Sequence, residues 1–188
     1  MAKNDQQEAY EKLLSANHAR MIEFSKFAET KNAALLTFCS VWMGAIITLL
    51  RAPEQLPLGY TFAFRAALPL LFIAALVSLK SLMPKFLHQI HKRDDDYKNL
   101  LYFGDIAEGG TKDYPEMAAD LYLPKENDSA SETYLHDLAV QTAIHAKIAY
   151  RKFRMFNWAG ALVLAAFAIM TTPPLLFCVR WAISQLQC

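Results

Sequence analysis

Residues 33–50 read AALLTFCSVWMGAIITLL, eighteen residues without a charged side chain, bracketed by Lys31 and Arg51. An α-helix of that length rises about 27 Å, which is close to the hydrocarbon thickness of a bilayer. Two further apolar stretches follow: residues 59–83, whose only charges are Arg65 and Lys80, and residues 158–179, which carry none. The sequence therefore predicts three transmembrane helices.

Two features inside these spans need a separate interpretation. Lys80 lies near the end of the second span, where its ammonium group can extend to the headgroups, and Arg65 either does the same or faces a polar pore. In the third span, the TTPP sequence at residues 171–174 predicts a kink or a break near the outer end, because proline has no N–H to donate.

The composition fits a membrane protein with a charged, water-exposed part. Hydrophobic residues make up 54% of the 188 residues, and 19 Lys and Arg nearly balance 18 Asp and Glu. The charges gather between the apolar stretches, which argues against a single soluble globule, and 12% aromatic residues argue against disorder. The near-neutral charge gives no support for binding a nucleic-acid polymer. Cys39, Cys178 and Cys188 form no CxxC pair, so neither a zinc site nor a disulfide framework is expected.

Two of the spans are predicted to continue as helices outside the membrane. No Gly or Pro interrupts residues 3–43, and residues 1–32 carry an apolar stripe with helical spacing. The members of this stripe are Tyr10, Leu14, Met21, Phe24 and Ala28. Residues 132–157 form a second long helix that enters the third span, and Ser129 and Glu132 have the spacing of a capping box. We expect an all-α membrane protein in which the two extended helices form a small cytoplasmic helical bundle.

The domain organisation and the orientation follow from these elements. We expect a cytoplasmic amphipathic helix at 1–32, a transmembrane hairpin at 33–83, a cytoplasmic helical region at 84–157 with a loop at 108–131, and a third transmembrane helix with a short outer tail at 158–188. Within the loop, Asp113 and Pro115 fit the start of one short helix. Residues 1–32 carry five Lys and Arg and residues 80–154 carry eleven, so the N-terminus and the central region are predicted to be cytoplasmic and the C-terminus outside.

Catalytic chemistry has little support in the sequence. His88, His91 and the Asp94–Asp96 run permit a metal site on a helix, but their spacing matches no standard hydrolase motif, and a solvated charged helix is the commoner interpretation. The sequence contains no GxSxG, P-loop, GxGxxG or HExxH motif. We therefore expect neither an enzyme nor a bound metal.

Three blocks of sequence resemble the transmembrane effector family of Pycsar antiphage systems. They are AETKNAALLTF at 28–38, NLLYFGDIA at 99–107 and LAVQTAIHAKIAYRKFRMFNWA at 138–159. The resemblance covers nearly the whole chain. It implies a bacterial inner-membrane protein whose cytoplasmic region, including 84–157, senses cyclic CMP or cyclic UMP made by a neighbouring cyclase. It further implies membrane impairment, followed by growth arrest or abortive infection, with the cyclic nucleotide as activating ligand and no other cofactor.

Candidate contacts for such a ligand follow from residue type and location. A cyclic mononucleotide needs cations for its phosphate, an aromatic or apolar wall for its base, and polar groups for the base edge and ribose. The candidates are Asn17, Arg20, Lys31, Asn99, Tyr102, Phe103, Asp105, His145, Lys147, Arg151 and Arg154. Some have other interpretations: Lys147, Arg151 and Arg154 also suit lipid headgroups, and Asn17 also suits a register-setting position in a helix bundle.

Besides the metal-dependent membrane enzyme that His88, His91 and the Asp94–Asp96 run would permit, two functional classes stay open at this point. The first is a ligand-gated membrane effector, in which a homo-oligomer forms the lesion because one chain offers only three spans. The second is a non-signalling membrane scaffold or small transporter subunit that binds a protein partner through its cytoplasmic helices. Binding of a cyclic nucleotide to the purified protein distinguishes the two.

Overall fold

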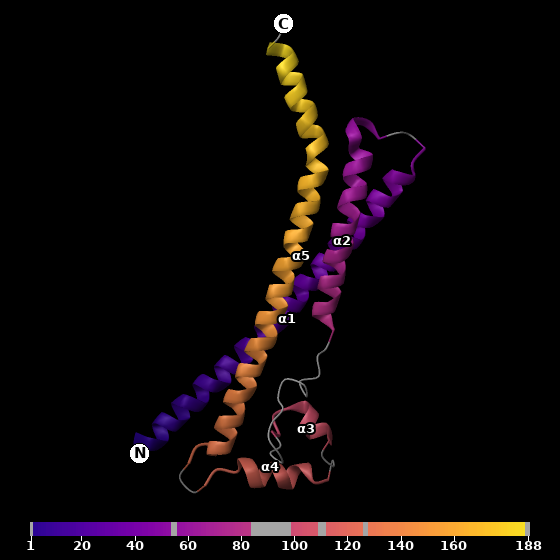
Figure 1. The fold of residues 1–188 in the computed structure, drawn as a ribbon. Coiled ribbons are helices and arrows are strands. Elements are labelled where there is room, and N and C mark those ends of the chain that lie inside the picture. Colours follow the sequence, from indigo (N-terminus) through magenta and orange to yellow (C-terminus); the bar gives the residue numbers. More distant parts are fainter. Residues whose placement is uncertain (1, 54–55, 84–98, 109–111, 126–127, 187–188) are drawn as a thin grey trace. The chain divides into compact units, whose positions relative to one another are not determined.

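The computed structural model describes residues 2–53, 56–83, 99–108, 112–125 and 128–186. These residues form the helices α1 (Ala2–Arg51), α2 (Tyr60–Leu82), α3 (Phe103–Glu108), α4 (Tyr114–Tyr122) and α5 (Glu132–Leu186), with a short 3-10 turn η1 (Pro57–Gly59) before α2. Figure 1 shows α1 and α5 as the two long helices. Among the described residues, three helices are long and apolar enough to cross a membrane: α1, α2 and α5. The predicted all-α fold with three spans, two of them extended, is confirmed.

The chain divides into two compact units. Unit 1 consists of residues 1–26 and 84–150, and unit 2 of residues 27–83 and 151–188. Helices α1 and α5 each contribute residues to both units. The three apolar spans fall in unit 2, and α3 and α4 fall in unit 1.

The core of unit 2 is built mainly from small side chains. On α2, the buried positions Ala63, Ala67, Leu71 and Ala74 recur every three or four residues, so they form one face of the helix. This face packs with Cys39 and Ile46 of α1 and with buried residues of α5 in one cluster. Small residues allow helix backbones to approach closely, which is how helices associate where lipid removes the hydrophobic driving force.

The hairpin between α1 and α2 depends on a glycine. Gly59 precedes α2 with φ +79°, in the left-handed region that an L side chain rarely adopts. Pro57 opens the short turn before it. This combination leads the chain directly into α2.

The prolines of the third span do not end the helix, because α5 continues from Glu132 to Leu186 through Pro173 and Pro174. Figure 1 shows that α5 changes direction in its yellow part without ending. The carbonyl of Ile169 would ordinarily accept from the N–H that Pro173 lacks, and the Thr172 hydroxyl donates to it at 2.7 Å instead. The Thr172 hydroxyl thus replaces one of the two hydrogen bonds that the prolines remove, and the helix continues past them.

The starts of the shorter elements agree only in part with the sequence. A helix begins after Asp113 with Pro115 in its first turn, as predicted, but the Asp113 side chain makes no capping hydrogen bond. The N-terminus of α5 is capped by Ser131, whose hydroxyl oxygen accepts from the Tyr134 N–H at 3.2 Å. The predicted cap at Ser129 is wrong: its hydroxyl has no partner among the described residues. The reason is that Ser131 directly precedes the first helical residue, Glu132.

The buried positions of the two long helices repeat every seven residues. On α1, alternate steps of four and three connect buried or half-buried positions from Leu14 to Ile46, and on α5 they connect Leu135 to Pro173. This spacing is typical of coiled-coil seams. It differs from the predicted stripe: Leu14, Met21 and Ala28 belong to the seam, whereas Tyr10 and Phe24 are exposed.

Candidate functional site

The eleven candidate residues divide between the two units. Unit 1 holds Asn17, Arg20, Asn99, Tyr102, Phe103, Asp105, His145 and Lys147. Unit 2 holds Lys31, Arg151 and Arg154.

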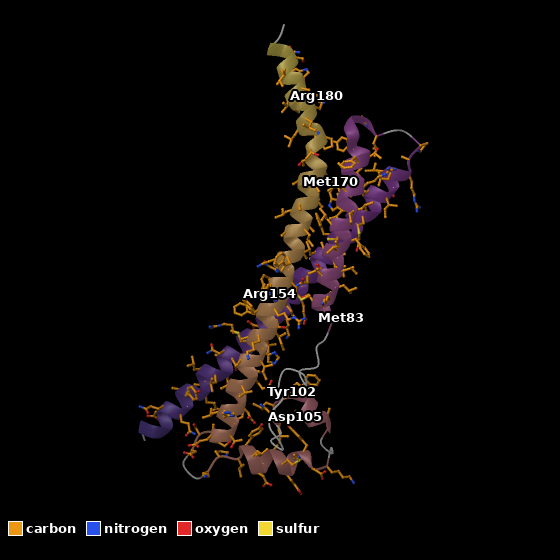
Figure 2. The ribbon with its side chains drawn as sticks, in the orientation of Figure 1. Met83, Tyr102, Asp105, Arg154, Met170 and Arg180 are labelled. Carbon is orange, nitrogen blue, oxygen red and sulfur yellow. The ribbon has the colours of Figure 1, made fainter. Side chains whose placement is uncertain are left out.

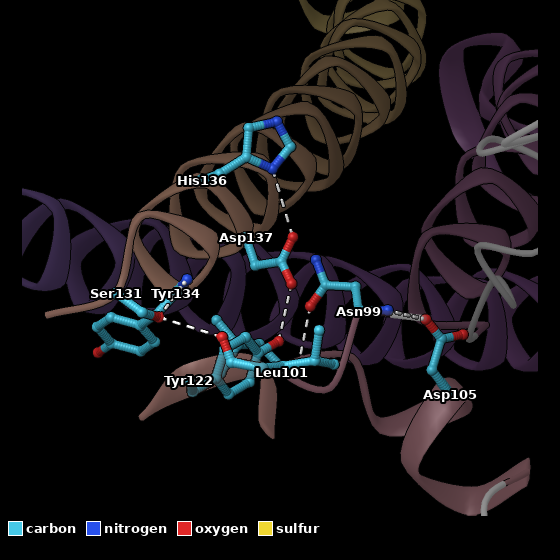
Figure 3. A network of polar contacts seen from close by, with 9 residues as sticks. Asn99, Leu101, Asp105, Tyr122, Ser131, Tyr134, His136 and Asp137 are labelled. Atoms are coloured by element: carbon cyan, nitrogen blue, oxygen red, sulfur yellow. Dashed lines mark hydrogen bonds and ion pairs between the residues drawn. The ribbon is translucent and has the colours of Figure 1, made fainter. Parts of the chain in front are cut away.

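Four candidates in unit 1 lie in one tight turn that precedes and begins α3. The backbone N–H of Asn99 donates to the Asp105 carboxylate at 2.8 Å, and the Asn99 side-chain oxygen accepts from the Leu101 N–H at 2.9 Å (Figure 3). Asn99 is buried, and the neighbouring Leu100 is 1% exposed, which anchors the turn. The Asn99 side-chain nitrogen is buried and has no acceptor among the described residues. A buried amide donor without an acceptor is costly, and a ligand carbonyl or phosphate oxygen would satisfy it.

Two aromatic rings extend this turn. The rings of Tyr102 and Phe103 lie 4.9 Å apart between centroids, and Phe103 is exposed. A Cβ built on Gly104 would meet the Tyr102 ring, with Cζ at 2.9 Å, so the glycine permits the ring to fold over the start of α3. Gly104 thus permits a close approach, and the group that approaches it is the Tyr102 ring.

A buried carboxylate, Asp137 on α5, was not among the predicted site residues. Its side chain is fully buried, the Tyr122 hydroxyl donates to one oxygen at 2.8 Å, and His136 Nδ1 lies 3.4 Å from the other (Figure 3). Ser131 links the same region by donating to the Leu121 carbonyl at 3.3 Å. No local pattern marks Asp137 in the sequence, because it lies outside the seven-residue seam and is buried only through tertiary packing.

A pair of histidines forms a polar layer between α1 and α5 in unit 1. The rings of His18 and His145 meet edge to face with centroids 5.2 Å apart, and Thr142 Oγ1 lies 3.5 Å from His18 Nδ1. Burial lowers the pKa of His18 below its usual value, because the charged imidazolium loses solvation. Of the two, sequence reasoning selected only His145; the seven-residue spacing that places His18 in the seam was the missing signal.

The remaining unit 1 candidates are peripheral to these contacts. Asn17 is half-buried, and Arg20 and Lys147 are exposed. Neither cation has an acidic partner within ion-pair distance among the described residues. The structure thus brings Asn99, Tyr102, Phe103 and Asp105 together in one turn, without joining Arg20 or Lys147 to it.

In unit 2, Lys31 and the basic part of α5 lie in a different environment. The Lys31 ammonium group lies over the Phe27 ring at 4.5 Å and at 5.5 Å from the Phe156 ring centroid. Arg151 is half-buried and Arg154 is exposed.

Between these arginines, Lys152 pairs with Glu29 of α1. The fully buried Asn32 side chain donates to the Lys152 carbonyl at 3.2 Å and to the Ala28 carbonyl at 2.8 Å. Two polar contacts from α1 therefore meet at Lys152.

The metal hypothesis for His88, His91 and Asp94–Asp96 concerns residues outside those the structure describes. Among residues 2–53, 56–83, 99–108, 112–125 and 128–186, no group of three or more His, Cys, Asp or Glu side chains has the geometry to hold a metal ion.

Unit 1 therefore has a centre that suits a small polar ligand. The turn at 99–105 offers a buried amide donor, a carboxylate and two aromatic rings, and Asp137 adds a fully buried carboxylate in the same unit. Hydrogen-bond donors and acceptors suit the edge of a nucleobase, and aromatic rings suit its face. A phosphate would require a cation, and this turn contains none.

Comparisons with known proteins identify the family. Residues 13–180 match the family described as "Pycsar effector protein domain". The chain is 74% identical over 175 residues to "Pycsar effector protein RsPycTM" from a Rhizobium species, and the match covers 93% of this chain and the whole length of that protein. No solved structure shows a significant match. The chain therefore belongs to the Pycsar transmembrane effector family, whose members are membrane effectors of antiphage defence.

Proposed function

We propose that the chain senses cyclic CMP or cyclic UMP with unit 1 and then impairs the inner membrane, which leads to growth arrest or abortive infection. The nucleotide is supplied by a neighbouring cyclase. The observation that carries the proposal is that α1 and α5 each contribute residues to both units and also contain two of the three spans. A ligand that prefers one arrangement of these helices in unit 1 acts on the same helices that cross the membrane.

The turn at 99–105 is the proposed contact for the base. Tyr102 and Phe103 supply rings for stacking. The Asn99 amide nitrogen, which has no acceptor among the residues that the structure describes, supplies a donor for a pyrimidine carbonyl oxygen. The distribution of Lys and Arg along the sequence supports a cytoplasmic unit 1 and a C-terminus outside. A lesion requires several chains, since three helices enclose no wide channel, so we expect a homo-oligomer.

The first test is thermal unfolding of the detergent-purified protein with a panel of cyclic mono- and dinucleotides. Specific binding stabilises the folded state, by about 2.7 kcal/mol at a hundredfold excess over Kd. We expect a shift with cyclic CMP or cyclic UMP. A folded protein that responds to none of them would refute the proposal and favour the scaffold function.

Two variants then test the turn itself. Asn99→Asp keeps the oxygen that accepts from Leu101 and removes the amide donor, and Tyr102→Ala removes one ring. Tyr102→Ala is expected to weaken nucleotide binding about tenfold, in line with the loss of about 1–3 kcal/mol for one stacked base. Asn99→Asp is expected to weaken it to a similar degree, because a buried carbonyl oxygen left without its donor costs about 1–3 kcal/mol. Lys112→Gln, an exposed cation before α4, is the matched control and is expected to bind as the wild type does.

A further inference from the structure

Three cations of unit 2 lie next to the points where the long uncharged stretches of its helices begin. On α1, Lys31 is the last charged residue before the apolar stretch that ends at Arg51, and on α5, Arg154 is the last before Arg180. Figure 2 shows Arg154 and Arg180 at well separated points along α5, with Met83 at the end of unit 2 that carries Arg154. Helices that are free of charge over this length cross the hydrocarbon layer, so Lys31 and Arg154 mark one of its borders.

The contacts of Lys31 hold its ammonium group at this border. Its packing over the rings of Phe27 and Phe156 ties the side chain to α1 and α5 through cation–π contacts. Such contacts do not neutralise the charge. Among the described residues, no carboxylate lies within ion-pair distance of Lys31.

The basic stretch of α5 separates into an inward and an outward group. Lys152 pairs with Glu29, and its side chain is only 16% exposed. Arg151 and Arg154 have no acidic partner within ion-pair distance among the described residues, and Arg154 is exposed. One helical turn beyond Arg154, Trp158 is 66% exposed, as expected of an aromatic anchor at a membrane–water interface.

We propose that Arg151 and Arg154 bind the phosphodiester of an anionic phospholipid headgroup, with Lys31 and Trp158 at the same interface. Guanidinium groups suit phosphate oxygens because they donate two parallel hydrogen bonds. A cyclic nucleotide also carries a phosphodiester, so its chemistry alone does not exclude it here. The lipid is favoured because these cations belong to unit 2, at the border of the spans, whereas the aromatic and amide groups suited to a base lie in unit 1.

The interaction does not depend on the proposed nucleotide sensing, and its test is separate. The protein is reconstituted into nanodiscs of phosphatidylcholine with increasing phosphatidylglycerol, and thermal unfolding is followed by circular dichroism. We expect phosphatidylglycerol to stabilise the wild type. The double variant Arg151→Gln/Arg154→Gln is expected to weaken the apparent lipid affinity about fivefold for each cation removed.

Arg180→Gln is the matched control, because it removes an exposed arginine from the other end of the span in α5. It is expected to keep the wild-type response. Helix content and unfolding in pure phosphatidylcholine establish that each variant is folded. Should the double variant itself unfold there, Arg151→Lys/Arg154→Lys provides the second test: it keeps the charge, and a partial loss of affinity is expected because the bidentate geometry is lost.

Three outcomes would overturn the proposal. The first is a double variant that responds to phosphatidylglycerol as the wild type does. The second is an equal loss in Arg180→Gln, which would show a non-specific charge effect. The third is a double variant that keeps the lipid response but loses stabilisation by cyclic CMP or cyclic UMP in phosphatidylcholine, which would assign the cations to the nucleotide. Failure of the wild type to bind any nucleotide would leave the lipid comparison intact.

Discussion

Neutralising Glu29 is expected to destabilise unit 2 more than neutralising its ion-pair partner Lys152. The two side chains differ in exposure: 46% for Glu29 and 16% for Lys152. In Glu29→Gln, the Lys152 ammonium group keeps its charge in a mostly desolvated position without a carboxylate beside it. In Lys152→Met, the apolar stem is retained, and the carboxylate left behind is half-exposed to solvent.

The size of the difference follows from these exposures. Breaking a buried ion pair by removing one partner costs about 3–5 kcal/mol, and exposed pairs contribute about 0–1 kcal/mol. Because Lys152 is mostly but not fully buried, we expect Glu29→Gln to lower the free energy of unfolding by about 2 kcal/mol. Lys152→Met is expected to cost less than about 1 kcal/mol. The double variant is expected to resemble Lys152→Met, since the unpaired buried charge is then absent.

The expected order of stabilities is measured by thermal unfolding of the wild type, the two single variants and the double variant. All four are compared in one detergent, at low and at high salt. The exposed pair of Glu8 and Lys12 on α1 provides the control, and Glu8→Gln is expected to leave unfolding unchanged. The loss in Glu29→Gln is expected to persist at high salt, because mobile ions screen a desolvated charge poorly. Equal losses in the two single variants, or a larger loss in Lys152→Met, would refute the reasoning.

Three further predictions concern unit 1. Gly104→Ala is expected to displace the Tyr102 ring and weaken nucleotide binding with little change in the unfolding temperature, because the atoms it meets end a rotatable side chain; calorimetric titration and thermal unfolding together measure this. Tyr122→Phe removes the donor to the buried Asp137 carboxylate and is expected to cost about 1–3 kcal/mol in chemical denaturation. Because burial lowers the pKa of His18, the unfolded state binds its proton first as pH falls, so stability is expected to decrease below about pH 6.5, and less so in His18→Gln.

The helices of the membrane part were predictable because their signals are local. A run without charge marks a span, and the absence of Gly and Pro marks an uninterrupted helix, so α1 follows from its own residues. The prolines of α5 show the limit of this reasoning. Their missing N–H groups are visible in the sequence, but the compensating bond from Thr172 to Ile169 becomes clear only once the rotamer is known.

The candidate site was predictable only where its residues are neighbours in the sequence. Asn99, Tyr102 and Asp105 were selected together and share one turn, because a turn is formed by adjacent residues. Asp137 was missed, since its burial arises from segments distant in the sequence, and its hydrogen bond comes from Tyr122 in a region predicted to be mostly loop. Grouping residues by type and by location in the sequence placed Arg151 and Arg154 in the same set, although they belong to the other unit.

The seven-residue repeat suggests how ligand binding in unit 1 would act on the membrane spans, which is the coupling proposed above. A seam of apolar side chains alone tolerates more than one pairing of two helices, and polar residues at seam positions restrict the choice, at some cost in stability. The repeat on α1 passes through His18 in unit 1 and Asn32 in unit 2 without interruption. Each is held by a polar contact to α5: His18 with Thr142, and Asn32 with the Lys152 carbonyl. A ligand that changes the pairing of α1 and α5 in unit 1 therefore acts on helices that carry a further polar contact, at Asn32, near the border of the spans. The free energy available for the change is limited to the difference in ligand affinity between the two pairings, and a shift from 1:99 to 99:1 requires about 5.5 kcal/mol.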